Sequence, residues 1–126
     1  MSFDKRKTAS IGKFGEDYTA QFLRSKGYII VKRNWRDSRF GEIDIVAESR
    51  ENIVFVEVKT RSKNALYSGA EAIDYRKMLR TRNAAQSFMK RFNTNLDFRI
   101  DVAEVTVENS TDGLNVVKFN YLESVG

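Results

Sequence analysis

Apolar residues recur at helical spacing in two stretches of the chain. Residues 9–26 carry one stripe, made of Ile11, Phe14, Tyr18 and Phe22, with Gly27 as a stop signal behind it. Residues 70–91 carry a second stripe, made of Ala70, Ile73, Ala84, Ala85 and Phe88. Side chains three and four positions apart share one face of a helix. Both stretches are therefore predicted to be helices that bury this face.

The remaining apolar segments show the alternation that is typical of strands. These segments are residues 28–34, a hairpin at 40–61, and two strands near 98–107 and 115–121 that are separated by the turn "STDG". The predicted order is αβββαββ, an α/β fold in which helices pack on a mixed central sheet. At 126 residues the chain is expected to be a single domain that spans residues 1–126.

The hairpin of residues 40–61 groups its apolar side chains. Because side chains alternate along a strand, Ile43, Ile45 and Ala47 are predicted to share a face. The turn is expected near "ESREN", with its centre between Arg50 and Glu51. In that register the three residues lie opposite Val58, Val56 and Val54. A slip of one residue would place acids on the buried face, so the pattern specifies the register.

The other face of the hairpin places acid opposite acid. The same register sets Asp44 opposite Glu57 and Glu42 opposite Lys59. Opposed β-carbons lie ~4.5–5.5 Å apart, so both carboxylates of the Asp44–Glu57 pair can bind one ion. Mg²⁺ or Mn²⁺ suits oxygen-only ligands, and Lys59 would lie near a metal-held water or phosphate. The set predicts metal-dependent phosphodiester chemistry; an exposed polar face is the alternative.

Composition narrows the chemistry. The chain has no Cys and no His, which excludes thiol nucleophiles, disulfides and imidazole bases. Its net charge of +5 is unevenly spread: residues 1–39 hold ten basic and four acidic side chains, whereas residues 97–126 hold two and six. A cationic face favours nucleic acid, although a charge that only promotes solubility is an equal alternative. With no signal peptide and no apolar run near ~20 residues, a cytoplasmic protein without a membrane segment is expected.

Three strings resemble a known family. "GKFGEDYTAQFLRSKGYIIVKRNWR", "GEIDIVA" and "FVEVKTR" resemble the uncharacterised bacterial YraN family, over about residues 9–105. Asp44 followed by Glu57-x-Lys59 also resembles the PD-(D/E)xK nuclease superfamily, and YraN proteins are similar to archaeal Holliday-junction resolvases. The residue before Asp44 is Ile43 rather than the proline of the superfamily's name. The resemblance implies a restriction-endonuclease-like αβββαββ fold.

The same resemblance implies site residues and partners. Asp44 and Glu57 look like metal ligands, Lys59 like the catalytic lysine, and Glu16 like an additional acid that resolvase-like members bring to the metal. An exposed acid favoured by the helix dipole is the alternative for Glu16. The implied activity is a Mg²⁺-dependent DNA endonuclease that selects structure, such as branched DNA, with RNA left open. Resolvase-like relatives are dimers, so a homodimer is expected.

Basic residues outside this set are candidate nucleic-acid contacts. The loop "KRNWRDSRFG" places basic side chains among Trp35 and Phe40, a mixture that suits a phosphate backbone. Lys77, in the second helix, either extends along the core edge or points toward the acidic hairpin. The predicted contacts are Arg33, Arg36, Arg39, Arg61, Lys77 and Arg80.

Two other classes of function remain open from the sequence. One is a catalytically inactive nucleic-acid-binding module of the same fold, which would bind DNA with strong salt dependence and cut nothing. The other is a protein-interaction domain whose charge only promotes solubility.

Overall fold

In the part of the chain that the structure describes, two helices and five strands follow one another in the predicted order αβββαββ. The structure is a computed structural model that describes residues 5–63, 75–92 and 94–125. The elements are α1 (Lys5–Ser25), β1 (Ile29–Asp37), β2 (Gly41–Glu48), β3 (Asn52–Ser62), α2 (Tyr75–Arg91), β4 (Asp97–Ser110) and β5 (Gly113–Leu122). This α/β arrangement confirms the restriction-endonuclease-like order, with a mixed sheet and a helix on each of its faces. Residues 70–74 of the predicted second helix lie outside the described residues.

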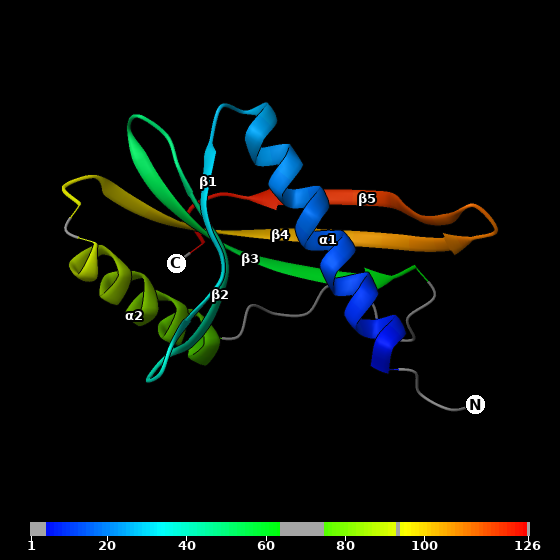
Figure 1. Ribbon diagram of the computed structural model, residues 1–126, viewed down its shortest axis with the longest axis horizontal. Helices are drawn as coiled ribbons and strands as arrows, with labels where there is room; N and C mark the ends of the chain where they lie inside the picture. The colour runs from blue at the N-terminus through cyan, green and yellow to red at the C-terminus, as the bar shows by residue number, and fades with distance from the viewer. Residues whose placement is uncertain (1–4, 64–74, 93, 126) are drawn as a thin grey trace.

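The strands form one sheet in the order β1-β2-β3-β4-β5 (Figure 1). Neighbouring strands are antiparallel except for β3 and β4, which are parallel along their whole paired length. A parallel pair needs a crossover, and the chain between β3 and β4 includes α2. The central strand β3 therefore has a hairpin partner on one side and a crossover partner on the other.

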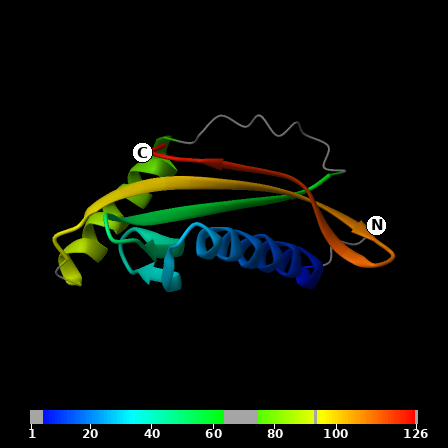
Figure 2. The ribbon, with the colours of Figure 1, turned by 90° about the horizontal axis from the view of Figure 1, so that it is seen from above.

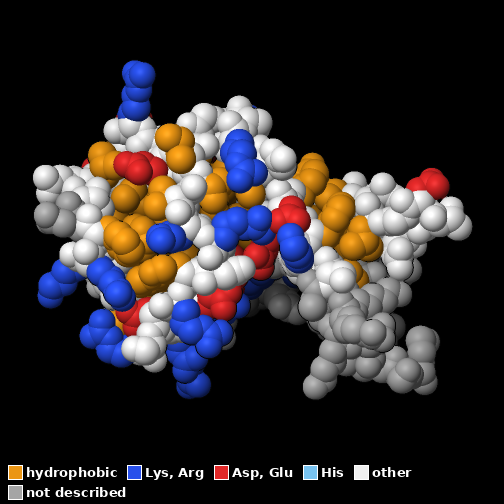
Figure 3. Space-filling view, viewed as in Figure 1, with side chains coloured by type: hydrophobic (Ala, Val, Ile, Leu, Met, Phe, Trp, Pro, Cys, Tyr) orange, Lys and Arg blue, Asp and Glu red, His pale blue; other side chains and the backbone are white. Residues whose placement is uncertain are grey.

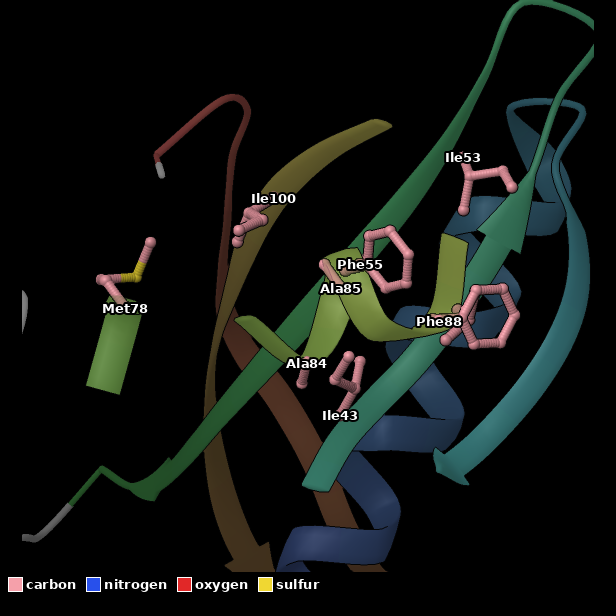
Figure 4. Packing of buried hydrophobic residues seen from close by; sticks show 9 residues of the cluster. Ile43, Ile53, Phe55, Met78, Ala84, Ala85, Phe88 and Ile100 are labelled. Atoms are coloured by element: carbon pink, nitrogen blue, oxygen red, sulfur yellow. The ribbon is translucent and has the colours of Figure 1, made fainter. Parts of the chain in front are cut away.

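The sheet has a buried cluster on each face. Ala20 and Leu23 of α1 pack against Val54 and Val56 of β3, and α1 runs along one side of the sheet in Figure 2. Phe88 of α2 packs in the opposite cluster, whose other members include Phe55, Ile53, Ala84, Ala85 and Ile100 (Figure 4). Alternate residues of β3 thus enter different clusters, so this strand is buried on both sides.

The buried face of α1 differs from its predicted stripe. Tyr18 is 41% exposed and Phe22 only half-buried, because both lie at the margin, where their rings pack edge-on against Phe119 of β5. The side that faces the sheet is lined instead by Gly15, Thr19, Ala20 and Leu23, all of them buried. A β-carbon at Gly15 would collide with the side chain of Thr60. Small residues therefore let α1 approach β3 closely, and that approach fixes the position of the neighbouring Glu16.

The predicted hairpin register is confirmed near the turn. Ile45 pairs with Val56 and Ala47 with Val54, and the turn closes through a 2.9 Å hydrogen bond from the Ser49 amide to the carbonyl oxygen of Asn52. The ladder ends at Ile45 and Val56, so the pairs predicted beyond this point do not form. From there β2 and β3 separate, while β3 stays paired with β4 as far as Ser62.

The prediction that Ile43 shares a face with Ile45 and Ala47 is wrong. Ile43 packs in the α2 cluster, whereas Ile45 packs in the α1 cluster. The neighbouring strand shows why: Asn34 of β1 lies between the partners of these two residues and has a φ of 52°. This left-handed conformation, which Asn tolerates, interrupts the alternation of faces along β1. Val46, expected beside the acids, is buried in the α2 cluster.

Candidate functional site

A carboxylate-lined pocket opens where β2 separates from β3. Its volume is about 350 Å³. Asp44 and Glu42 come from β2, Glu57 from β3, and Lys77 from α2; the remaining lining residues are Ile43, Val56 and Thr81. We call it the acidic pocket. Asp44 and Glu57 both line this pocket although their backbones do not pair.

The side chain of Asp44 accepts a hydrogen bond from the backbone of β3 where the β2–β3 ladder has ended. Its Oδ2 accepts a 2.8 Å hydrogen bond from the amide of Val58, which lies just beyond the end of the β2–β3 ladder. Burial raises the pKa of the Asp44 carboxyl to about 6, and the negative charges of Glu16 and Glu57 raise it further against the effects of Val58 and Lys77. Near neutral pH this site therefore holds a poorly solvated negative charge.

Glu57 is the more deeply buried acid. It is only 7% exposed, and its Oε1 is in ion-pair contact with the ammonium group of Lys77. Among the described residues, Oε1 has no hydrogen-bond partner besides this ion pair. Lys77 thus points toward the acidic face, which was one of its two interpretations from the sequence. A cation is already held against this carboxylate.

Lys59 follows Glu57 on the same face of β3. Val58 packs toward α1, so the strand alternation directs its neighbours Glu57 and Lys59 to the side of α2. Lys59 is half-buried, lies outside the lining of the acidic pocket, and is paired in register with Glu104 of β4. The spacing predicted from the sequence is retained, and Glu104 is an additional acid that sequence reasoning did not place here.

Glu16 lies on the α1 side of the same region. Its Oε1 accepts a 3.0 Å hydrogen bond from Asn34 Nδ2 and lies 3.6 Å from Arg33 Nη2. Burial raises the pKa of Glu16, against the effect of Arg33, and the charge of Glu42 raises it as well. Its charge reaches Asp44, yet no group of three Asp or Glu side chains within the described residues is arranged to hold a metal ion.

Most of the predicted nucleic-acid contacts pair with acids of the chain. Arg33 Nη1 lies 2.7 Å from Asp17 Oδ1, Arg36 Nη2 3.3 Å from Glu42 Oε2, and Arg39 Nε 3.6 Å from Asp37 Oδ1. Arg80 lies on the exposed side of α2 and lines a pocket beside the acidic pocket. Arg61 is half-buried, and its Nη1 is buried without a hydrogen-bond partner in the described part of the chain.

Sequence reasoning missed a second buried carboxylate, Asp101 of β4. This residue is fully buried; its Oδ1 accepts hydrogen bonds from Arg99 Nε (2.9 Å) and the Ser124 amide (3.0 Å). Its Oδ2 accepts hydrogen bonds from Arg99 Nη2 (3.0 Å) and Tyr121 Oη (2.6 Å). The acid in the apolar strand "FRIDVAEVTV" was a signal for a buried charge. With every oxygen occupied, Asp101 serves the fold.

The acidic pocket suits a divalent cation. Mg²⁺ is usually held by one or two carboxylates together with water and phosphate oxygens, so Asp44 and Glu57 suffice as protein ligands. The raised pKa of Asp44 reflects burial and nearby negative charge, both of which a bound cation would offset. Hard oxygen ligands and the absence of Cys and His fit Mg²⁺ or Mn²⁺ rather than softer metals.

Fold and pocket together define a restriction-endonuclease-like α/β protein with a carboxylate pair at the separation of its central hairpin. Comparison with known sequences gives its family: residues 15–105 match the uncharacterised protein family UPF0102, to which this chain belongs. Neither helix in the described part of the chain is long and apolar enough to cross a membrane.

Several bacterial relatives are similar over nearly their full length. A UPF0102 protein of Bacteroides thetaiotaomicron is 40% identical over 108 residues, covering 86% of this chain and 88% of that protein. One of Syntrophomonas wolfei is 42% identical over 108 residues, covering 83% and 91%. One of Clostridium botulinum is 40% identical over 112 residues, covering 86% and 90%. The similarity confirms the predicted resemblance to an uncharacterised bacterial family.

Proposed function

We propose that this chain is a metal-dependent endonuclease that hydrolyses phosphodiester bonds of DNA, with branched DNA as its preferred substrate. The observation that carries the proposal is the convergence of Asp44 and Glu57, from adjacent strands, on one pocket. Two partly desolvated carboxylates facing the same space repel each other unless a cation lies between them. The basic surface around the pocket supports a polyanionic substrate.

Each residue of the proposed site has a separate task. Asp44 and Glu57 would hold Mg²⁺, or Mn²⁺, through their carboxylate oxygens. The bound ion would supply a water of lowered pKa and neutralise charge on the phosphate. Lys59, on the same face as Glu57, would position or deprotonate that water or stabilise negative charge on the phosphate. Glu16 would act on the same centre from α1 through its charge.

A homodimer is part of the proposal, because two symmetric copies suit the cutting of two strands. The edge strand β1 supports it by exposing apolar side chains, with Ile29 71% and Val31 38% exposed. Light scattering after size exclusion would report the mass directly; a monomer at all concentrations tested would remove the dimer from the proposal without affecting the site.

The test is a cleavage assay on labelled duplex, single-stranded, flap and four-way-junction DNA with Mg²⁺, Mn²⁺ or EDTA. Glu57→Gln and Asp44→Asn proteins would be compared with a Glu48→Gln control, which changes a half-buried acid of β2 outside the acidic pocket. Metal-dependent cutting should be lost in the first two proteins and kept in the control. Calorimetric titration with Mn²⁺ gives a second readout, since either site variant should weaken binding. Cutting that persists in both variants would assign the activity to another site or to a contaminant.

The ion pair of Lys77 with Glu57 specifically favours one alternative, an inactive nucleic-acid-binding module. An ammonium group that neutralises the buried acid permanently would leave no need for metal. An inactive module would bind DNA with salt dependence, cut none of the substrates and bind no Mn²⁺.

A further inference from the structure

A second, basic pocket lies at the other end of α2. Its volume is about 470 Å³, and it is formed between the β1–β2 turn and the last turn of the helix. Four cationic side chains line it, Arg36 and Arg39 from the hairpin and Lys90 and Arg91 from α2. In Figure 3, Lys and Arg side chains gather over α2 and the β1–β2 turn. We call this site the basic pocket.

Among the described residues that line the basic pocket, the one acid is Asp37, and its carboxylate oxygens are occupied by structural contacts. Its Oδ1 accepts hydrogen bonds from the amides of Arg39 (2.8 Å) and Phe40 (3.2 Å), and its Oδ2 accepts one from the Ser87 hydroxyl (2.7 Å). Arg39 Nη2 also donates to Ser87 Oγ, at 3.4 Å. These bonds tie the turn to α2, so two separate basic segments face one another in a fixed arrangement.

The guanidinium and ammonium groups of this pocket remain largely open to an incoming ligand. The side chains of Arg36 and Arg39 are 76% and 69% exposed although each is near an acid, and Lys90 and Arg91 make no ion pair within the described residues. Two lysines or arginines at a helix C-terminus stabilise the helix dipole, which accounts for Lys90 and Arg91 alone. It does not account for Arg36 and Arg39, which come from another element and face the same hollow.

From this arrangement we infer that the basic pocket binds a backbone phosphate of the DNA strand whose scissile bond lies at the acidic pocket. Guanidinium groups match phosphate geometry, and several cationic groups around one hollow favour a polyanion such as a DNA strand over chloride. The inference rests on the proposed function for the position of the scissile bond. It adds a second point of attachment for the same DNA strand, the phosphate held in the basic pocket, which we call the anchor.

The fold sets the distance between the anchor and the acidic pocket. Thr81 lines the acidic pocket and Ser87 the basic pocket, and the outer limits on α2 are Lys77 and Arg91. At 1.5 Å of rise per residue these pairs are separated by roughly 9 Å and roughly 20 Å along the helix. One strand of a duplex advances 3.4 Å per phosphate, so the anchor lies about three to six base pairs from the cut.

The test measures binding of hairpin-capped DNA stems of about four to about sixteen base pairs, with Ca²⁺ in place of Mg²⁺ so that a cation can hold the strand at the acidic pocket. A gel of each sample shows that the stem stays intact. The probe is a fluorescein-labelled stem followed by anisotropy. The Lys90→Ala/Arg91→Ala protein is compared with wild type and with an Arg24→Ala/Lys26→Ala control. The control removes the same charge from exposed residues at the end of the other helix.

The expected result is a step in affinity when the stem exceeds about six base pairs, in wild type and control. The Lys90/Arg91 variant should lose the step, with long stems bound about tenfold more weakly and the salt slope reduced by about 0.9 per lost contact. Equal affinity of variant and wild type at every length would overturn the inference. So would displacement of the stem by sub-millimolar inorganic phosphate, which would mark a site for free anions. A protein that shows the step but cuts no DNA with metal would lose the nuclease proposal and keep the anchor.

Discussion

Asp44, which is half-buried, and Asp101, which is fully buried, lie on strands of the same sheet, yet their surroundings are opposite. Asp101 accepts four hydrogen bonds, two of them from the guanidinium group of Arg99. Within the described residues Asp44 accepts one, from a backbone amide, and it faces a pocket with two other acids in its lining. A charge that is fully paired stabilises the fold, whereas one left partly unpaired remains available to a ligand. The difference separates a structural carboxylate from a candidate functional one.

The largest effect is expected from Asp101→Ala. Removal of this carboxylate leaves the guanidinium group of Arg99, whose side chain is 21% exposed, without its bidentate partner. Breaking a buried pair from one side reduces the free energy of unfolding by about 3–5 kcal/mol. Urea unfolding followed by circular dichroism measures it. Asp97→Ala, at an exposed position of the same strand, should change little; equal losses in the two variants would show that the network contributes nothing.

Asp44→Asn should raise the free energy of unfolding at pH 7, whereas Asp101→Ala lowers it. The folded Asp44 carboxyl, with its pKa raised to about 6, holds a proton between about pH 4 and 6, whereas the unfolded one, near 3.9, has lost it. Wild-type stability therefore falls as pH rises through this window, by up to about 3 kcal/mol. The asparagine variant, measured in EDTA, should be more stable than wild type at pH 7 and no more stable at pH 4. An advantage that is the same at both pH values would place its cause elsewhere than in the carboxylate charge.

Tyr121→Phe is expected to reduce the free energy of unfolding by a smaller amount. The phenol donates a 2.6 Å hydrogen bond to Asp101 Oδ2, while the ring packs against Phe22 and Phe119 in contacts that phenylalanine keeps. The Arg99 contacts of Asp101 also remain. The expected cost is about 1–2 kcal/mol in urea unfolding. A loss as large as that of Asp101→Ala would mean that the hydroxyl, and not the guanidinium group, is the main partner of Asp101.

The smallest effect concerns the cation already present in the acidic pocket. Lys77→Gln removes the ammonium group from Glu57, so a divalent cation no longer competes with it. Mn²⁺ should bind about twofold to fivefold more tightly, measured by calorimetry, because the Lys77 side chain is 60% exposed and its ion pair is weak. Arg80→Gln is the matched control on the same helix. Weaker Mn²⁺ binding in the Lys77 variant would indicate that this lysine orients Glu57 for the metal.

The spacing of apolar residues along the chain predicted much of the fold. The order of elements, the register of the hairpin near its turn and the burial of Ala84, Ala85 and Phe88 follow from apolar spacing alone. The pattern did not predict that β2 changes face between Ile45 and Ile43. That change is accompanied by a left-handed residue, Asn34, on the neighbouring strand. The rule that side chains alternate between faces assumes a regular strand, so it does not predict such a change.

In the candidate site, too, the sequence predicted some relations between residues, and only the packing of the elements decided others. Alternation and spacing placed Glu57 and Lys59 on one face and Asp44 near them, because those relations depend on neighbours along two adjoining strands. Helix periodicity left two directions open for Lys77, and the packing of α2 on the sheet selected contact with Glu57. The basic pocket has no sequence signature, since it joins residues 36–39 to residues 87–91.

The sequence by itself therefore determined which side chains are available and how they are spaced along each element: carboxylates without Cys or His, a net positive charge and the order of helices and strands along the chain. Only the tertiary structure decided which carboxylate is satisfied and which is left open. Hydrogen bonding and desolvation depend on groups far apart in the chain, such as Arg99 with Tyr28 or Asp37 with Ser87. The β2–β3 ladder ends at Ile45 and Val56, and this end leaves Asp44 facing a pocket.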